Sequence, residues 1–267
     1  MRRELVVAFG LSACLAIAAS CRTSEVDADP RPTSRSTGAE ATSEEPRTQV
    51  GGSAAADRTP AWESLFDGAT LAGWRGYRRG DVPDGWRVED GAITRVGAGG
   101  DLVTERTFEN FVLEFEWKLA PGGNSGVFYG VTEEHPHAWE SGAEYQILDD
   151  DAHADGLDPR TSAAANYALH APVGGSLRPP GEWNRGRIEV LGDRVRHGLN
   201  GTVVVEFTRF DPAWEQVVAG SKFGDMPAYG RARRGRIALQ DHGDPVAYRG
   251  LRILDLGSAT TVPAIER

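Results

Sequence analysis

The run ESGAEYQILDD places an acid and an amide two residues apart in a short alternating segment. Read as a strand, it directs its apolar side chains to one face and Glu144 and Gln146 to the other, and Asp149 follows at once. Carboxyl groups transfer protons, and amides and carboxylates pair with sugar hydroxyls. This polar face is therefore either a hydrated surface or the floor of a polar site.

A second run, RIALQDHG, repeats the arrangement, since Gln240 and His242 fall on the face opposite its bulky aliphatic residues. Two strands that each carry a Gln beside an ionisable group predict a shared carbohydrate groove on a curved sheet. The glycine-rich run PGGNSGVFYG adds Asn124, where a tight turn or close approach of a ligand explains the glycines equally well. Trp139 and Trp183 fall in polar loops and are candidates for stacking on a sugar ring.

The run DDDAHADGLD has the spacing of the start of a calcium loop and contains His153. Its twelfth position is Ser162 rather than Glu, which argues against an EF-hand. A divalent metal remains open, and no organic cofactor is expected. The sequence lacks a phosphate-binding glycine loop, a Gly-x-Ser-x-Gly elbow and a His-Glu-x-x-His motif.

These residues belong to a region of short, alternating segments rich in valine and aromatic residues. The run FENFVLEFEWKL predicts a strand, and Asn200-Gly201 predicts a tight hairpin because both turn positions favour positive φ. Only 212–223 suggests a short helix, with a loop as the alternative. The pattern predicts an all-β domain over 61–257, built as a jelly-roll sandwich of two antiparallel sheets, followed by a tail at 258–267.

The amino terminus predicts export. Two arginines precede an apolar run that is too short to span a bilayer, so 1–20 is interpreted as a signal peptide. Small residues lead into Cys21, which favours lipidation and a bacterial cell-envelope lipoprotein, with plain cleavage and secretion as the alternative. The polar segment 21–60 is interpreted as a disordered tether. The net charge of −10 argues against nucleic acid as a partner.

Five motifs in order resemble the 3-keto-disaccharide hydrolase domain family: LFDGATLAGW, NSGVFYG, EYQILDDDAHADG, GEWNRGRIEVLGDRVRHGLNGTVV and GRIALQDHGDPVAYRGLRI. The resemblance extends from about Ser64 to Leu256. It implies a concanavalin A-like sandwich and action on glycosides whose carbon 3 is a ketone, made by a separate sugar 3-dehydrogenase. A base would remove the proton on carbon 2, the glycosidic oxygen would leave, and water would add to the unsaturated sugar.

The resemblance also implies residue roles. Glu144, Asp149 and His242 are candidates for acid, base or metal binding. The candidates for substrate binding are Asn124, Gln146, His153, Tyr167, Trp183 and Gln240.

Two alternatives remain open from the residues alone. A non-catalytic sugar-binding module on a lipid tether would need the groove but no proton-transfer groups. A conventional retaining glycosidase would need Glu144 and Asp149 close together, although residues five apart on a regular strand point to opposite faces.

Overall fold

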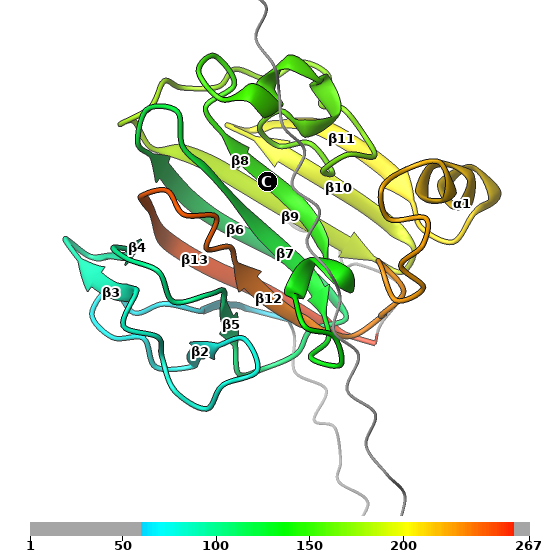
Figure 1. Cartoon of the computed structure of the whole chain (residues 1–267). Coiled ribbons are helices and arrows are strands. Elements are labelled where there is room, and N and C mark those ends of the chain that lie inside the picture. The colour runs from blue at the N-terminus through cyan, green and yellow to red at the C-terminus, as the bar shows by residue number, and fades with distance from the viewer. Residues whose placement is uncertain (1–59, 259–267) are drawn as a thin grey trace, which may run out of the picture. The chain divides into compact units, whose positions relative to one another are not determined.

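Two antiparallel sheets make up most of the regular structure in residues 60–258, the part of the chain that the computed structural model describes (Figure 1). The larger sheet has the strand order β11 (Thr202–Thr208), β10 (Arg194–Leu199), β9 (Asn184–Leu191), β6 (Asn110–Leu119), β13 (Val246–Gly257), β4 (Ala92–Arg95) and β3 (Trp86–Glu89), with β1 (Trp62–Ser64) also paired to β13. The smaller sheet has the order β2 (Trp74–Gly76), β5 (Leu102–Thr104), β12 (Arg236–Leu239), β7 (Asn124–Val131) and β8 (Ala143–Leu148). The predicted all-β jelly-roll sandwich is confirmed.

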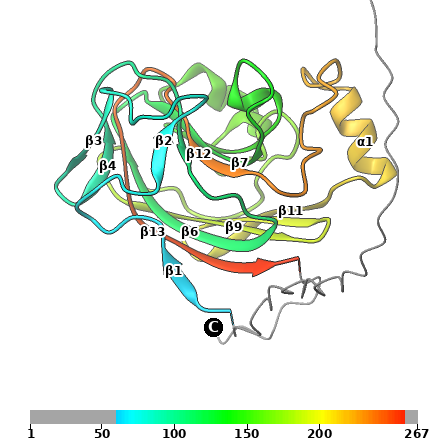
Figure 2. The same ribbon diagram turned by 90° about the horizontal axis from the view of Figure 1, so that it is seen from below.

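The hydrophobic core lies between the two sheets, which Figure 2 shows as two layers. Alternation along β6 directs Phe115 and Trp117 into the core, as the sequence pattern predicts. The smaller sheet contributes Tyr145 from β8 and Leu239 from β12. The intervening residues of β8 and of the segment after β12 therefore face away from the core, on the outer side of the smaller sheet.

The predicted hairpin joins β10 to β11, and Asn200 and Gly201 adopt φ values of 48° and 90°. The segment 212–223 splits into helix α1 (Pro212–Ala219) and a turn. Asp211 caps the helix by accepting a hydrogen bond from the Trp214 amide at 2.7 Å. The turn after α1 brings 220–223 toward the outer side of the smaller sheet. Three 3-10 helices flank β8 along the chain: η1 (Ala138–Glu140) comes before it, and η2 (Ala154–Leu157) and η3 (Pro159–Thr161) follow it.

A buried ion pair fixes the segment that follows β12. Arg95 of β4 donates to one carboxylate oxygen of Asp241, and the amides of Gly99 and Gly100 donate to the other at 2.8 and 2.9 Å. The two side chains are only 9% and 7% exposed. Burial raises the pKa of Asp241, but the hydrogen bonds from Arg95 and the two glycines outweigh it and leave the pKa below the ordinary 3.8. This pair anchors the segment carrying Gln240 and His242.

The calls on 1–20, on lipidation at Cys21 and on most of the tether and tail lie outside the described residues, 60–258. They remain predictions. Within the described part of the chain, no helix has the length and apolar character needed to cross a membrane.

Replacing Asp241 with Ala is expected to lower the free energy of unfolding by about 3–5 kcal/mol, because Arg95 would keep a buried, uncompensated charge. Urea unfolding at neutral pH measures the loss. The difference from wild type should shrink as pH falls below the unfolded-state pKa of 3.8, since a lowered pKa contributes stability only while the carboxylate is ionised. The exposed pair of Arg79 and Asp81 supplies the control, and Asp81→Ala should cost much less stability than Asp241→Ala. Equal losses for the two variants would contradict the anchoring role.

Candidate active site

A pocket of about 220 Å³ lies on the outer side of the smaller sheet. It brings together six of the nine residues that the sequence singled out for catalysis or substrate binding, namely Asn124, Glu144, Gln146, Tyr167, Gln240 and His242. The pocket is also lined by Trp139, which the sequence suggested as a stacking residue, and by two residues that the sequence analysis missed, Lys222 and Phe223.

The register of three neighbouring strands builds the floor of the pocket. In β7 and β8, Gly126 pairs with Gln146, and Phe128 pairs with Glu144. On the other side of β7, the backbone N–H of Gln240 donates to the backbone carbonyl of Gly126 at 2.9 Å. A side chain at Gly126 would overlap the Glu144 carboxyl, so the missing Cβ makes room for that group. The glycine therefore has a packing role, which an alternating polar pattern alone does not reveal.

Glu144 is the buried acid of this floor. Its side chain is only 5% exposed, and no hydrogen bond to its carboxyl occurs within residues 60–258. Burial raises the pKa of Glu144 from 4.5 to about 8, against the opposing effect of the Lys222 charge, and Asp101 and Asp155 add to the rise. Glu144 is thus a neutral carboxylic acid at pH 7, suited to donating a proton.

Three amide side chains surround this acid with unused hydrogen-bonding capacity. Neither polar atom of Gln146 has a partner within the described part of the chain, although the side chain is fully buried. The carbonyl oxygens of the Asn124 and Gln240 side chains are likewise unpaired. Buried polar atoms are costly when unpaired, so these groups indicate a site for a polar ligand.

Aromatic side chains form the walls. Trp139 is the second residue of η1, and its ring stacks on that of His137 with ring centres 5.3 Å apart. Tyr167 donates its hydroxyl hydrogen to Asp155 at 3.1 Å, which fixes the ring. Burial, and then the nearby Asp155, raise the pKa of Tyr167 well above its ordinary value, so the phenol stays protonated. Apolar rings beside unpaired amides are the usual composition of a sugar-binding pocket.

The rim carries the histidines. His242 lines the pocket with a side chain that is 46% exposed, and its Nδ1 lies 3.9 Å from Asp244. His153 does not line the pocket; its ring centre lies 6.1 Å from that of His242, and its Nδ1 accepts from the Asp155 amide at 3.1 Å. His153 therefore contributes to the surroundings of the pocket and helps to begin η2.

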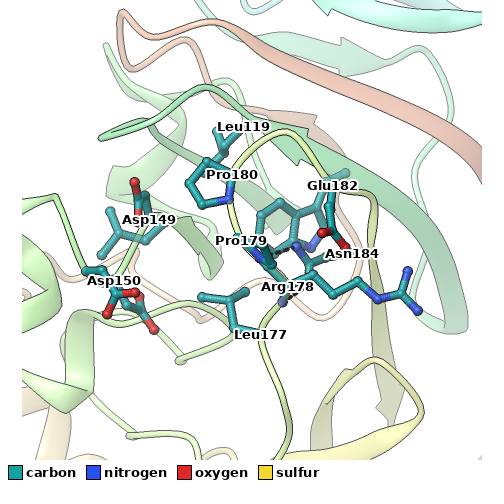
Figure 3. A pocket seen from close by; sticks show the side chains of 12 residues that line it. Leu119, Asp149, Asp150, Leu177, Arg178, Pro179, Pro180, Glu182 and Asn184 are labelled. Carbon is teal, nitrogen blue, oxygen red and sulfur yellow. Dashed lines mark hydrogen bonds between the residues drawn. The ribbon is translucent and has the colours of Figure 1, made fainter.

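Asp149, a predicted catalytic residue, does not line this pocket. Asp149 lies directly after β8, accepts a hydrogen bond from the Gly122 amide at 2.7 Å and lines a different pocket of about 340 Å³. In that second pocket, Asp149 and Asp150 face the loop that carries Leu177 and Pro180 (Figure 3). The odd separation of Glu144 and Asp149 sends their side chains to different places, which removes the carboxyl pair that a retaining glycosidase needs.

Trp183, a predicted substrate-binding residue, does not line this pocket either. Its ring packs beneath Arg249 at 4.0 Å and Lys118 at 4.8 Å, with the cations over the ring centre. Lys118 alternates with the core residue Trp117 along β6, so this cluster lies on the outer side of the larger sheet. Two cation–π contacts hold Trp183 there, and a polar, glycine-rich flank in the sequence does not distinguish the two sheets.

The metal-binding expectation stays open. Within residues 60–258, no three His, Cys, Asp or Glu side chains are grouped to bind an ion. The polar side chains that line the pocket are three amides, one carboxyl, one imidazole, one amine, one phenol and one indole.

Replacing Glu144 with Gln is expected to stabilise the fold at alkaline pH. A raised pKa means that the unfolded chain loses its proton above pH 4.5 while the folded one keeps it to about 8, so wild-type stability falls as pH rises through that window. The amide does not ionise. Urea unfolding should therefore show the variant gaining about 4 kcal/mol relative to wild type between pH 5 and pH 8.5. The exposed Glu134→Gln change is the control, and a Glu144→Gln difference independent of pH would refute a buried neutral acid.

Comparisons with known proteins agree with this site and fold. Residues 61–254 match the family described as the 3-keto-alpha-glucoside-1,2-lyase-like domain. The chain is 36% identical over 222 residues to a 3-keto-disaccharide hydrolase of Bacteroides thetaiotaomicron, covering 71% of this chain and 77% of that protein.

Two solved structures of Parabacteroides distasonis ATCC 8503, both described as putative glycosyl hydrolases, are also similar. The first is 33% identical, with a TM-score of 0.68, and the match covers 73% of this chain and 94% of that one. The second is 28% identical, with a TM-score of 0.57, and the match covers 73% and 100%. The resemblance drawn from the sequence and the prediction of a glycosidase-type enzyme are confirmed, and the chain belongs to the family of 3-keto-alpha-glucoside-1,2-lyase-like domains.

Proposed function

We propose that this chain cleaves glycosides whose sugar carries a ketone at carbon 3. The ketone acidifies the hydrogen on carbon 2, so that a base removes it and the electrons expel the glycosidic oxygen from carbon 1. Water then adds to carbon 1 of the unsaturated product while carbon 2 regains a proton. The net reaction is hydrolysis to a 3-keto sugar and an alcohol.

The observation that carries this proposal is the buried, neutral Glu144 carboxyl among three partly unpaired amides. An acid with a pKa near 8 can protonate the departing glycosidic oxygen at neutral pH, and its carboxylate can then take a proton from the attacking water. Two nitrogen bases, His242 and Lys222, line the same pocket and can accept the proton from carbon 2.

The pocket suits one sugar unit. Its volume of about 220 Å³ is below the roughly 300–1,000 Å³ typical of sites for drug-sized ligands. Asn124, Gln146 and Gln240 can pair with ring hydroxyls, and Trp139 and Tyr167 offer ring faces to the apolar side of a sugar. The Bacteroides relative, named a 3-keto-disaccharide hydrolase, supports the same substrate class.

The substrate chemistry implies a partner reaction. A ketone at carbon 3 arises by oxidation of the sugar, so a sugar 3-dehydrogenase must act before this enzyme. The amino-terminal sequence further supports export and a lipid anchor at Cys21 as the cellular setting.

The direct test compares a glucoside carrying a chromogenic alcohol with its 3-keto form, each incubated with the purified protein. We expect release of the alcohol from the oxidised substrate alone. A parallel assay with a chelator asks whether a metal takes part. Release from the plain glucoside, or from neither compound, would overturn the elimination mechanism.

Gly126→Ala is expected to lower turnover of the 3-keto substrate by about 10²- to 10⁴-fold, because the added Cβ displaces the Glu144 carboxyl. The φ of Gly126 is not positive, so backbone strain does not arise. Gly80→Ala is the matched control, since nothing lies near a Cβ at that position. Initial rates and thermal melting of both variants give the comparison. Wild-type turnover in Gly126→Ala would show that the position of the acid does not matter.

A further inference from the structure

Lysine is rare in this chain. Lys and Arg together number 29, yet only Lys118 and Lys222 are lysines. Lys118 lies over Trp183 on the outer side of the larger sheet, and Lys222 lines the candidate active site. Arginine stays protonated in proteins, whereas a buried lysine can become a neutral amine. The pocket thus holds the uncommon cation that can act as a base.

The position of the Lys222 amine is defined by its surroundings. Nζ lies 4.1 Å from the ring centre of Tyr167 and 5.1 Å from that of Phe223. Tyr167 is itself held by its hydrogen bond to Asp155. The two rings hold the amine at the wall of the pocket, which the turn after α1 forms. Glu144 belongs to strand β8, in the floor of the same pocket. Since Lys222 forms no ion pair within the described part of the chain, base and acid remain separate in the pocket.

The charges around Lys222 come from several elements. Glu144 belongs to β8 and Asp155 to η2, and Tyr167 lies in the loop that follows η3. Burial lowers the pKa of Lys222, and it outweighs the opposite effect of Glu144 and Asp155. Burial also raises the pKa of Glu144, so burial acts against the charged form of both groups.

We propose that Lys222 is the catalytic base that removes the proton from carbon 2, with Glu144 as the acid that protonates the leaving oxygen. This inference rests on the function proposed above. The lone pair of Nζ takes the proton, the C2–H electrons form the C1–C2 double bond, and the C1–O bond breaks as its oxygen takes the Glu144 proton. Water then gives its hydroxyl to carbon 1 and a proton to Glu144, and the Lys222 ammonium returns a proton to carbon 2.

His242 is the competing base. Its imidazole is nearly half-exposed, and the groups that neighbour it, His153 and Asp244, do not line the pocket. Lys222 is also exposed in part, but its Nζ lies over the rings of Tyr167 and Phe223, which both line the pocket. A base held by the walls of the site has a defined position from which to take a proton. The structure therefore favours Lys222 over His242.

Exchange of the carbon-2 hydrogen isolates the proton transfer. The 3-keto sugar product is incubated in D₂O with full-length protein, and loss of the carbon-2 proton signal is followed by NMR. We expect Lys222→Arg to slow both this exchange and cleavage of the 3-keto glucoside by at least about 10²-fold. The control, Lys118→Arg, should match wild type in both assays, and thermal melting checks that both variants fold.

Chemical rescue separates a base from a structural side chain. Added methylamine or ethylamine should restore part of the exchange and cleavage in Lys222→Ala, and more basic amines should restore more. Wild-type exchange in Lys222→Arg, or a loss in Lys222→Ala that no amine relieves, overturns the assignment. If wild type itself cleaves no 3-keto glucoside, the proposed function fails instead, and the two failures are distinguishable.

Discussion

The burial of one carboxyl group, that of Glu144, is the constraint on which the rest of the site depends. The group is deprived of water and of hydrogen-bond partners within residues 60–258, so its charged form is strongly disfavoured. Such burial is possible because Gly126 on the neighbouring strand has no side chain. A local gap in the sheet surface thereby converts an ordinary glutamate into a proton donor that works at neutral pH.

The remaining architecture keeps that gap in place. The backbone N–H of Gln240 donates a hydrogen bond to the Gly126 carbonyl. The Arg95–Asp241 pair then anchors the segment after β12 to the larger sheet. The jelly-roll core thus supplies rigidity beneath the site, while loops and the turn after α1 supply walls above it. The strands thus provide the floor of the pocket, and the segments that connect them provide most of its walls.

Alternation was enough to predict much of this. The period of two placed Glu144 and Gln146 opposite the core residue Tyr145, and it placed Gln240 opposite Leu239. It failed where alternation stops. Asp149 lies just past a strand end, and Trp183 lies in a loop beside the other sheet, so neither position follows from periodicity. The residues that flank them in the sequence resemble those around the residues that line the pocket, so composition does not separate the two groups either.

Lys222 illustrates a different limit. It lies in a turn far along the chain from Glu144, and only the fold brings the two together. The available signal was compositional, since a lysine in a chain that otherwise uses arginine stands out. The rarity of lysine singles out Lys222 but does not show which residues surround it in the fold. The hydrogen bond from Tyr167 to Asp155, which orients the ring beneath the amine, is likewise a tertiary contact between loop segments.

The protonation state of Glu144 is the central claim, and NMR titration of protein labelled with ¹³C at the glutamate carboxyl carbons tests it most directly. The resonance that disappears in Glu144→Gln identifies the group. The account predicts a titration midpoint near 8 for that resonance, well above those of the exposed glutamates. A midpoint near the ordinary 4.5 would contradict it, because Glu144 would then be ionised at neutral pH and unable to donate a proton.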